Sequence, residues 1–302
     1  MELHNRVAVV TGGASGIGRA LALAAAAEGA RGVVVADLDS QGADAVAKEI
    51  EATGGAAKAV RCDVSVEDDV RALVATAEST YGPVDAFFAN AGVLVGGGFD
   101  APEELWDRAW SINVKSHIYA ARAVVPGMLE RGEGYLVHTA SAAGLLMQLG
   151  AAPYTVSKHA IVSFAEYLSV THHAQGLRVS CLCPQAVATN LGTTSRDVLA
   201  GREPHSEARP SAQEATVAAG PLAGTEALRG TAASDGVVTP ERCAELVIEA
   251  MREERFLVLP HPEVATYEQH RAGDRERWLR GMRRAQAQLA SFFSGDRARP
   301  GN

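Results

Sequence analysis

Tyr154 and Lys158 stand four residues apart in an apolar, alanine-containing run that opens with Pro153. Residues at this spacing share one face of a helix, and proline favours the first helical turn, so a phenol and an ammonium should lie side by side. A free phenol has a pKa of about 10, and a fixed positive charge close by favours the phenolate. We therefore expect Lys158 to lower the pKa of Tyr154, and Tyr154 to act as an acid/base.

A hydroxyl group from a second element is predicted to reach the same place. Ser141 follows the segment 134–140, which has the apolar pattern of a buried strand. Its hydroxyl can hydrogen-bond the substrate oxygen that exchanges a proton with Tyr154. The Tyr-x-x-x-Lys spacing also occurs on ordinary helices, where the ring packs and the lysine is solvated, so the assignment depends on the rest of the chain.

A strand, a glycine-rich turn and a helix open the chain. Residues 6–10 form a short β-branched run, and residues 11–18 follow it with the spacing G-x-x-x-G-x-G. Gly12, Gly16 and Gly18 allow the backbone to approach a pyrophosphate closely, while the helix that follows presents free N–H groups to it. A glycine-rich turn is often only a turn, and here its position between a strand and a helix favours dinucleotide binding.

A second apolar run, residues 32–36, ends in Asp37, which stands 19 residues after Gly18. This is near the offset expected for the acid that binds an adenosine ribose. A carboxylate there accepts hydrogen bonds from both ribose hydroxyls and repels a 2′-phosphate. Since the glycine turn contains no lysine or arginine, we predict NAD rather than NADP, with a solvated strand-end aspartate as the alternative.

Strand and helix patterns alternate along most of the chain. The predicted strands are residues 6–10, 32–36, 58–64, 84–89, 134–140, 178–183 and 256–260. Such alternation implies right-handed crossovers and a parallel sheet covered on both faces, with ligands at the carboxyl ends of the strands. We predict an α/β fold with a Rossmann-like doubly wound parallel sheet of about seven strands in a single domain.

Further candidate site residues follow the predicted strands or lie between them. Asp63 and Val64 end the third strand, where Asp63 could meet an adenine, and Asn90 and Gly92 follow the fourth. Gly92 permits the close approach of a cofactor. Asn113 lies among apolar residues of a predicted helix, where it either bonds local backbone and bends the helix or holds a water beside the lysine.

In this order the motifs resemble the short-chain dehydrogenases/reductases over about residues 5–190. The resemblance implies a catalytic tetrad, which consists of Asn113, Ser141, Tyr154 and Lys158. It also implies an NAD(H) site with Lys158 on the nicotinamide ribose and Thr189 at the carboxamide. The cofactor site is predicted to contain Gly12, Ser15, Gly16, Ile17, Gly18, Asp37, Asp63, Val64, Asn90, Gly92, Tyr154, Lys158, Pro184, Val187 and Thr189. The family resemblance further suggests a homo-oligomer, a tetramer or a dimer, packed partly through the helices that carry Asn113 and Tyr154.

The chain departs from the family pattern at one position. The family usually has Pro-Gly where this chain has Pro184 and Gln185, so a side chain stands beside the expected nicotinamide site. We expect Gln185 either to shape the substrate pocket or to shift the nicotinamide ring slightly. Two residues of the mostly apolar loop 142–150, Ala143 and Gln148, are expected to line the same pocket.

The predicted reaction is hydride transfer between NAD(H) and a hydrophobic secondary alcohol or ketone. Apolar candidates for the pocket favour such a substrate: Val93, Leu94, Leu145, Met147 and Val187. Two alternatives are an NADP(H)-using carbonyl reductase of the same fold and a non-catalytic NAD-binding regulatory protein. A hydrolase is disfavoured because no G-x-S-x-G motif occurs, and the histidines and cysteines lack metal-ligand spacing, so we predict no metal.

Composition limits the partners and the compartment. A net charge of -8 over 302 residues argues against binding to nucleic acid, and the longest alanine/leucine run, residues 20–27, is too short to span a bilayer. The start of the chain has no signal-peptide pattern and the four cysteines form no C-x-x-C pair. We expect a cytoplasmic protein with a small-molecule substrate and no membrane partner.

Domain boundaries follow from changes in composition. We place the Rossmann-fold domain at residues 1–262 and a helical extension at 263–302. Within the domain, residues 191–238 have little periodicity, which indicates either a substrate lid or disorder, and we expect a lid that closes over the substrate. Between residues 264 and 293 of this extension, six arginines indicate an amphipathic helix, either on the protein's own surface or at an oligomer interface.

Overall fold

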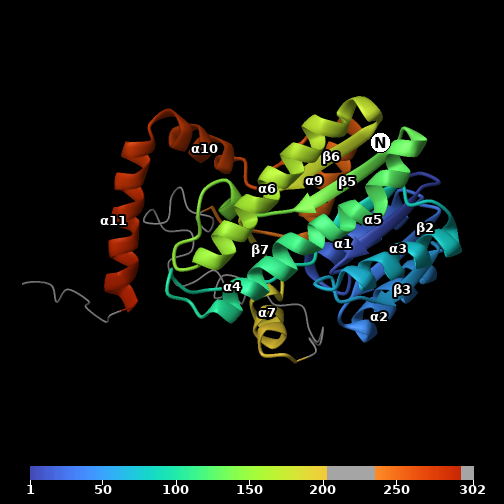
Figure 1. Ribbon diagram of the computed structural model, residues 1–302, viewed down its shortest axis with the longest axis horizontal. Coiled ribbons are helices and arrows are strands. Elements are labelled where there is room, and N and C mark those ends of the chain that lie inside the picture. The colour runs from blue at the N-terminus through green and yellow to red at the C-terminus, as the bar shows by residue number, and fades with distance from the viewer. Residues whose placement is uncertain (203–234, 294–302) are drawn as a thin grey trace, which may run out of the picture.

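Seven parallel strands form the central sheet of the computed structural model, which describes residues 1–202 and 235–293 (Figure 1). The strands are β1 (Val7–Thr11), β2 (Gly32–Asp37), β3 (Ala57–Arg61), β4 (Ala86–Ala89), β5 (Gly134–Thr139), β6 (Leu177–Leu182) and β9 (Leu257–Val258). Their order across the sheet is β3-β2-β1-β4-β5-β6-β9. The predicted doubly wound parallel sheet is confirmed. Two short strands that were not predicted, β7 (Ala186–Val187) and β8 (Val237–Val238), pair beside it.

Helices cover both faces of the sheet. One face carries α1 (Gly16–Ala27), α2 (Ser40–Ala52) and α9 (Pro240–Glu253), and the other carries α3 (Glu67–Tyr81), α5 (Ser116–Arg131) and α6 (Ala152–His172). Successive strand residues point into opposite layers, so Phe87 packs on the α5 and α6 side and Phe88 on the α1 side. Both faces are therefore buried, which explains the continuous apolar runs in the sequence.

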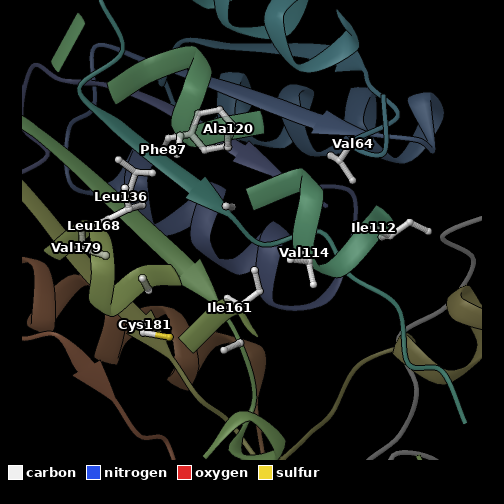
Figure 2. Packing of buried hydrophobic residues seen from close by; sticks show 14 of the residues in the cluster. Val64, Phe87, Ile112, Val114, Ala120, Leu136, Ile161, Leu168, Val179 and Cys181 are labelled. Atoms are coloured by element: carbon white, nitrogen blue, oxygen red, sulfur yellow. The ribbon is translucent and has the colours of Figure 1, made fainter. Parts of the chain in front are cut away.

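The larger of the two cores lies under α5 and α6. Phe87, Leu136 and Val179 stand in register on neighbouring strands. Figure 2 shows these side chains near Ile161 and Leu168 of α6. Fully burying a side chain of this size contributes about 1.5–3 kcal/mol. This packing fixes α6, and with it Tyr154 and Lys158, against the sheet.

The helix predicted around Asn113 is present but not uniform. It consists of α4 (Glu103–Trp110), a π-helical turn η1 (Ser111–Lys115) and α5. Two shorter 3-10 turns occur elsewhere, η2 (Ala142–Gly144) and η3 (His173–Gln175). A π turn inserts an extra residue into a helix and is common at functional sites, and Asn113 lies inside this one.

The region predicted as a substrate lid is described only in part. Its first residues form α7 (Leu191–Leu199), a helix that the weak periodicity did not predict, whereas residues 203–234 lie outside the described residues. After residue 262 the chain forms α10 (Glu263–Gly273) and α11 (Arg275–Phe293), and α11 stands at one end of the molecule beyond α10 (Figure 1). The lid and the boundary at residue 262 remain predictions. None of the described helices has both the length and the hydropathy needed to cross a bilayer.

Candidate active site

A cavity of about 530 Å³ lies at the carboxyl ends of the strands, and most of the predicted site residues line it. The predicted residues that line it are Gly12, Ser15, Gly16, Ile17, Asp37, Asp63, Val64, Asn90, Gly92, Ser141, Gln148, Tyr154, Lys158, Pro184, Gln185, Val187 and Thr189. Three others, Gly18, Asn113 and Ala143, do not line it. Each of these three supports a residue that does.

The glycine turn between β1 and α1 forms a cradle at one end of this cavity. Gly12 has a φ of 65°, a left-handed conformation that favours glycine. A Cβ atom on Gly18 would lie only 2.0 Å from the carbonyl oxygen of Gly12, so Gly18 permits the close packing of helix on turn. Ser15 at the helix N-cap makes no side-chain capping bond, which leaves first-turn N–H groups for a ligand. The cradle therefore fits the pyrophosphate of a dinucleotide.

Asp37 ties the end of β2 to this turn. Its two carboxylate oxygens accept hydrogen bonds from the backbone N–H groups of Ala14 and Asp39, each at 3.0 Å. Burial raises the pKa of Asp37, while these backbone donors lower it by less. The carboxylate thus stands on the cavity wall where an adenosine ribose would lie.

A hydrogen-bond network joins the ends of β1, β4 and β5. The side-chain amide of Asn90 donates to the carbonyl oxygen of Thr11 at 3.1 Å, and its oxygen accepts from the Thr139 hydroxyl at 3.1 Å. The supporting role of Thr139 was not predicted from the sequence. The only signal for it is a polar residue at the end of an apolar strand, next to the strand that ends before Asn90.

Asn113 is buried and holds the segment that follows β4. Its side-chain oxygen accepts from the backbone N–H of Val93 at 2.8 Å, and its amide donates to the Val93 carbonyl at 3.0 Å and to the Ser157 hydroxyl at 3.1 Å. These bonds reach across to another segment, so the local-backbone alternative is not observed. A Cβ atom on Gly92 would lie 3.2 Å from the Asn113 oxygen and 3.4 Å from Lys158 Nζ. The side chains of Asn113 and Lys158 therefore both come close to the backbone of Gly92.

Replacing Asn113 by alanine is expected to lower the free energy of unfolding by about 2–4 kcal/mol, because it leaves the buried polar groups of Val93 and Ser157 without partners. Urea denaturation would measure the loss. Thr76→Ala, which removes an exposed hydroxyl from α3, is the matched control and should change stability by less than about 0.5 kcal/mol. Equal stability of the two variants would contradict the structural role of Asn113.

Tyr154, Ser141 and Lys158 meet on the cavity wall near the ends of β5 and β6. Ser141 lines this wall together with Tyr154, and its hydroxyl donates to the carbonyl oxygen of Pro184 at 3.4 Å. Its hydroxyl oxygen also accepts from the backbone N–H of Ala143 at 3.1 Å, so the buried Ala143 supports the serine instead of lining the pocket. Lys158 is only 3% exposed, and its Nζ donates to the carbonyl oxygen of Thr139 at 3.0 Å and lies 5.7 Å from the centre of the Tyr154 ring.

The pKa directions differ from the sequence-based expectation. Burial raises the pKa of Tyr154, and the Ser141 hydroxyl lowers the pKa by less. The expected lowering by Lys158 is not found, because the loss of solvent around the phenol dominates and the ammonium is directed at Thr139. Burial also lowers the pKa of Lys158 to about 8. Tyr154 therefore keeps its proton at neutral pH in this structure.

The substrate end of the cavity is mostly apolar, although not entirely through the predicted residues. Val93, Leu94 and Val187 line it, whereas Leu145 and Met147 do not. The helix α7 contributes a further wall that was not predicted, formed by Leu191, Gly192, Thr194 and Val198. In the described part of the chain, no three His, Cys, Asp or Glu side chains cluster as metal ligands would.

A parallel sheet with a glycine turn and an acidic residue at its carboxyl edge defines a dinucleotide-binding protein of the Rossmann class. The model of the short chain dehydrogenase family matches residues 6–199. The chain therefore belongs to the short-chain dehydrogenases/reductases, and it is an oxidoreductase of that family.

Curated relatives align with nearly two thirds of the chain. The 1-deoxy-11-beta-hydroxypentalenate dehydrogenase of Streptomyces exfoliatus is 40% identical over 195 residues, which are 63% of this chain and 70% of that protein. The cyclohexanol dehydrogenase of an Acinetobacter species is 34% identical over 194 residues, 63% of this chain and 76% of that protein. Both relatives are dehydrogenases of small molecules.

Solved structures cover more of the chain. A short-chain dehydrogenase/reductase from Burkholderia phymatum in complex with NAD superposes with a TM-score of 0.76 at 31% identity and covers 91% of this chain and 96% of that one. A 7α-hydroxysteroid dehydrogenase with NADH and 7-oxo glycochenodeoxycholic acid gives a TM-score of 0.69 at 25% identity, with 85% and 93% covered. These likenesses support a nicotinamide cofactor.

Proposed function

We propose that this protein is an NAD-dependent dehydrogenase of hydrophobic secondary alcohols, and of the corresponding ketones in reverse, with Tyr154 as the acid/base. One observation carries the proposal: Tyr154, Ser141 and Lys158 line the same cavity as the glycine turn and Asp37. A proton-transfer group and a dinucleotide cradle in one cavity are what hydride transfer to or from a C–O bond requires.

In this proposal different residues of the cavity bind different parts of the cofactor. The glycine turn and the α1 N-terminus hold the pyrophosphate, Asp37 holds the adenosine ribose, and Lys158 lies where it can hold the nicotinamide ribose. Bound NAD supplies the ring carbon that accepts a hydride. Val187 and Thr189, which line the same cavity, would fix the nicotinamide end.

The substrate oxygen would lie between Tyr154 and Ser141. Ser141 donates a hydrogen bond that orients the oxygen, and Tyr154 removes the hydroxyl proton during oxidation or returns it during reduction. The carbinol carbon loses its hydride as the C–O bond becomes a carbonyl, so one proton and one hydride leave the alcohol. The apolar wall of Val93 and Leu94 favours a hydrophobic substrate over a charged one.

Mixing the full-length protein with NAD and a panel of cyclic and acyclic secondary alcohols, and following the absorbance of NADH, tests this proposal. Oxidation of hydrophobic alcohols with NAD is the expected result. Turnover with NADP(H) alone would favour a carbonyl reductase of the same fold. Binding of NADH without turnover of any alcohol or ketone would favour a regulatory NAD-binding protein.

The NAD preference should depend on the charge of Asp37. Asp37→Asn keeps an oxygen that can accept hydrogen bonds and removes the negative charge that would repel a 2′-phosphate, so the ratio of kcat/KM for NAD over NADP should fall by at least about tenfold. Initial rates with each cofactor would measure it. Asp68→Asn, at an exposed position of α3, should leave the ratio unchanged. An unchanged ratio in Asp37→Asn would remove the basis for the NAD assignment.

A further inference from the structure

Gln185, the residue that departs from the family pattern, forms a two-way bridge to Asp235. The Gln185 amide nitrogen donates to a carboxylate oxygen of Asp235 at 2.8 Å, and the Asp235 backbone N–H donates to the Gln185 side-chain oxygen at 3.1 Å. The Gln185 residue is only 8% exposed while it lines the cavity. A glycine at this position could make neither bond.

The bridge holds the turn between the proposed catalytic and cofactor residues. The Pro184 carbonyl, directly before Gln185, accepts a bond from the Ser141 hydroxyl at 3.4 Å. Directly after Gln185, β7 pairs with β8 and leads to Thr189. The backbone N–H of Gln185 donates to His261 Nδ1 at 3.2 Å. A shift of Gln185 would therefore move both Pro184, which contacts Ser141, and the strand β7 that leads to Thr189.

The same bridge reaches the C-terminal helices through Asp235. The Tyr267 hydroxyl in α10 donates to the second Asp235 carboxylate oxygen at 2.9 Å. One turn further along α10, Arg271 donates to the carbonyl oxygen of Leu145 and lies 3.4 Å from His159 Nε2. Unlike the other five arginines between residues 264 and 293, which are exposed, Arg271 is partly buried. The helix α10 thus contacts both the 142–150 loop and, through Asp235, the β6–β7 turn.

We propose that Gln185 is a positioning residue that couples α10 to the substrate end of the cavity, and this inference rests on the proposed function. Its amide supplies the donor that the Asp235 carboxylate needs, and its oxygen supplies the acceptor that the Asp235 N–H needs. A glutamate would keep the acceptor, lose the donor and place a second negative charge against Asp235. Substrate affinity should then suffer more than cofactor affinity, because the glycine turn and Asp37 lie at the other end of the cavity.

A charge-swap experiment tests the coupling. Gln185→Glu is expected to raise KM for the alcohol at least about tenfold, while the Kd for NADH changes by less than about threefold. The double variant Q185E/D235N should restore KM to within about threefold of wild type. The reason is that the asparagine amide can donate to the new carboxylate while its oxygen still accepts from Tyr267. A merely structural defect would not be repaired by this exchange.

Hydrogen–deuterium exchange supplies a readout that does not depend on activity. Amide exchange across α10 should be faster in Gln185→Glu and in Tyr267→Phe than in wild type. In the double variant Q185E/D235N it should return toward the wild-type rate. The isosteric Gln185→Met, which carries no new charge, should behave like Gln185→Glu in both measurements and covers the case in which the glutamate variant fails to fold.

Wild-type kinetics in both single Gln185 variants, or a double variant no better than Gln185→Glu, would overturn the inference. Absence of turnover in the wild type would instead refute the proposed function, and the exchange data would still decide whether Gln185 holds α10.

Discussion

Replacing Tyr154 by phenylalanine is expected to lower kcat for alcohol oxidation by about 10³-fold and to leave the Kd for NADH within about threefold of wild type. The substitution removes only the hydroxyl that would exchange the substrate proton. The ring stays, so the packing of α6 against the larger core should survive (Figure 2). Stopped-flow or steady-state rates together with NADH fluorescence titration would measure both quantities.

The control for Tyr154→Phe comes from the same helix. Tyr167 lies on α6 and is 60% exposed, so Tyr167→Phe makes the identical chemical change away from the cavity and should keep wild-type turnover. If Tyr154→Phe oxidised alcohols at the wild-type rate, the acid/base would have to be another group. Lys158 would then be the first candidate, because its Nζ belongs to the same cavity wall.

Tyr154 should also determine how the rates of alcohol oxidation and ketone reduction depend on pH. Burial raises the pKa of Tyr154, so its proton is held at neutral pH and is lost only under alkaline conditions. Oxidation needs the deprotonated phenol and its kcat/KM should increase with pH, whereas ketone reduction needs the protonated phenol and should be faster at neutral than at alkaline pH. Both dependences should disappear from the residual activity of Tyr154→Phe.

The sheet and the site-forming ends of its strands could be predicted because their signals are local. The apolar runs that became β1 and β2 are continuous, as strands buried on both faces must be. β1 leads directly into Gly12 and β2 ends in Asp37, and both of these residues line the cavity. Gly18 could be placed because its spacing in the turn reflects a contact with Gly12 only six residues away. A short-range pattern thus recorded the cofactor cradle.

Other parts of the site could not be predicted because their partners are distant in sequence. Asn113 reaches Val93, Gln185 reaches Asp235 and Ser195 of α7 accepts from the Leu94 N–H at 2.8 Å. In each case the side-chain type shows that a partner is needed but not which one. The predicted lowering of the Tyr154 pKa was wrong for a related reason. The direction of this shift depends on how much solvent the tertiary structure removes from the phenol and on where the Lys158 ammonium points.

Replacing Lys158 by methionine is expected to lower kcat/KM for the alcohol by at least about 10²-fold. The substitution keeps an unbranched side chain of similar length and removes the ammonium from the wall it shares with Tyr154. NADH affinity should also fall, because the proposed contact with the nicotinamide ribose is lost. Lys115→Met, at an exposed position of η1, is the matched control and should retain activity.

The effect of Lys158→Met on the free energy of unfolding should depend on pH. Burial lowers the pKa of Lys158 from 10.5 to about 8, so the folded state disfavours the ammonium. This lowers the free energy of unfolding of the wild type by about 3 kcal/mol below pH 8, and the penalty disappears as the pH rises from about 8 to about 10.5. The methionine variant has no such group, although it leaves the Thr139 carbonyl without its lysine donor, at a cost that does not vary with pH.

Urea denaturation of both proteins at several pH values separates these two effects. Between neutral pH and about pH 10, the wild type should gain up to about 3 kcal/mol relative to Lys158→Met. The pH-independent offset between the curves reports the lost hydrogen bond to Thr139. A difference that stays constant with pH would show that Lys158 is not held in the folded state with a lowered pKa.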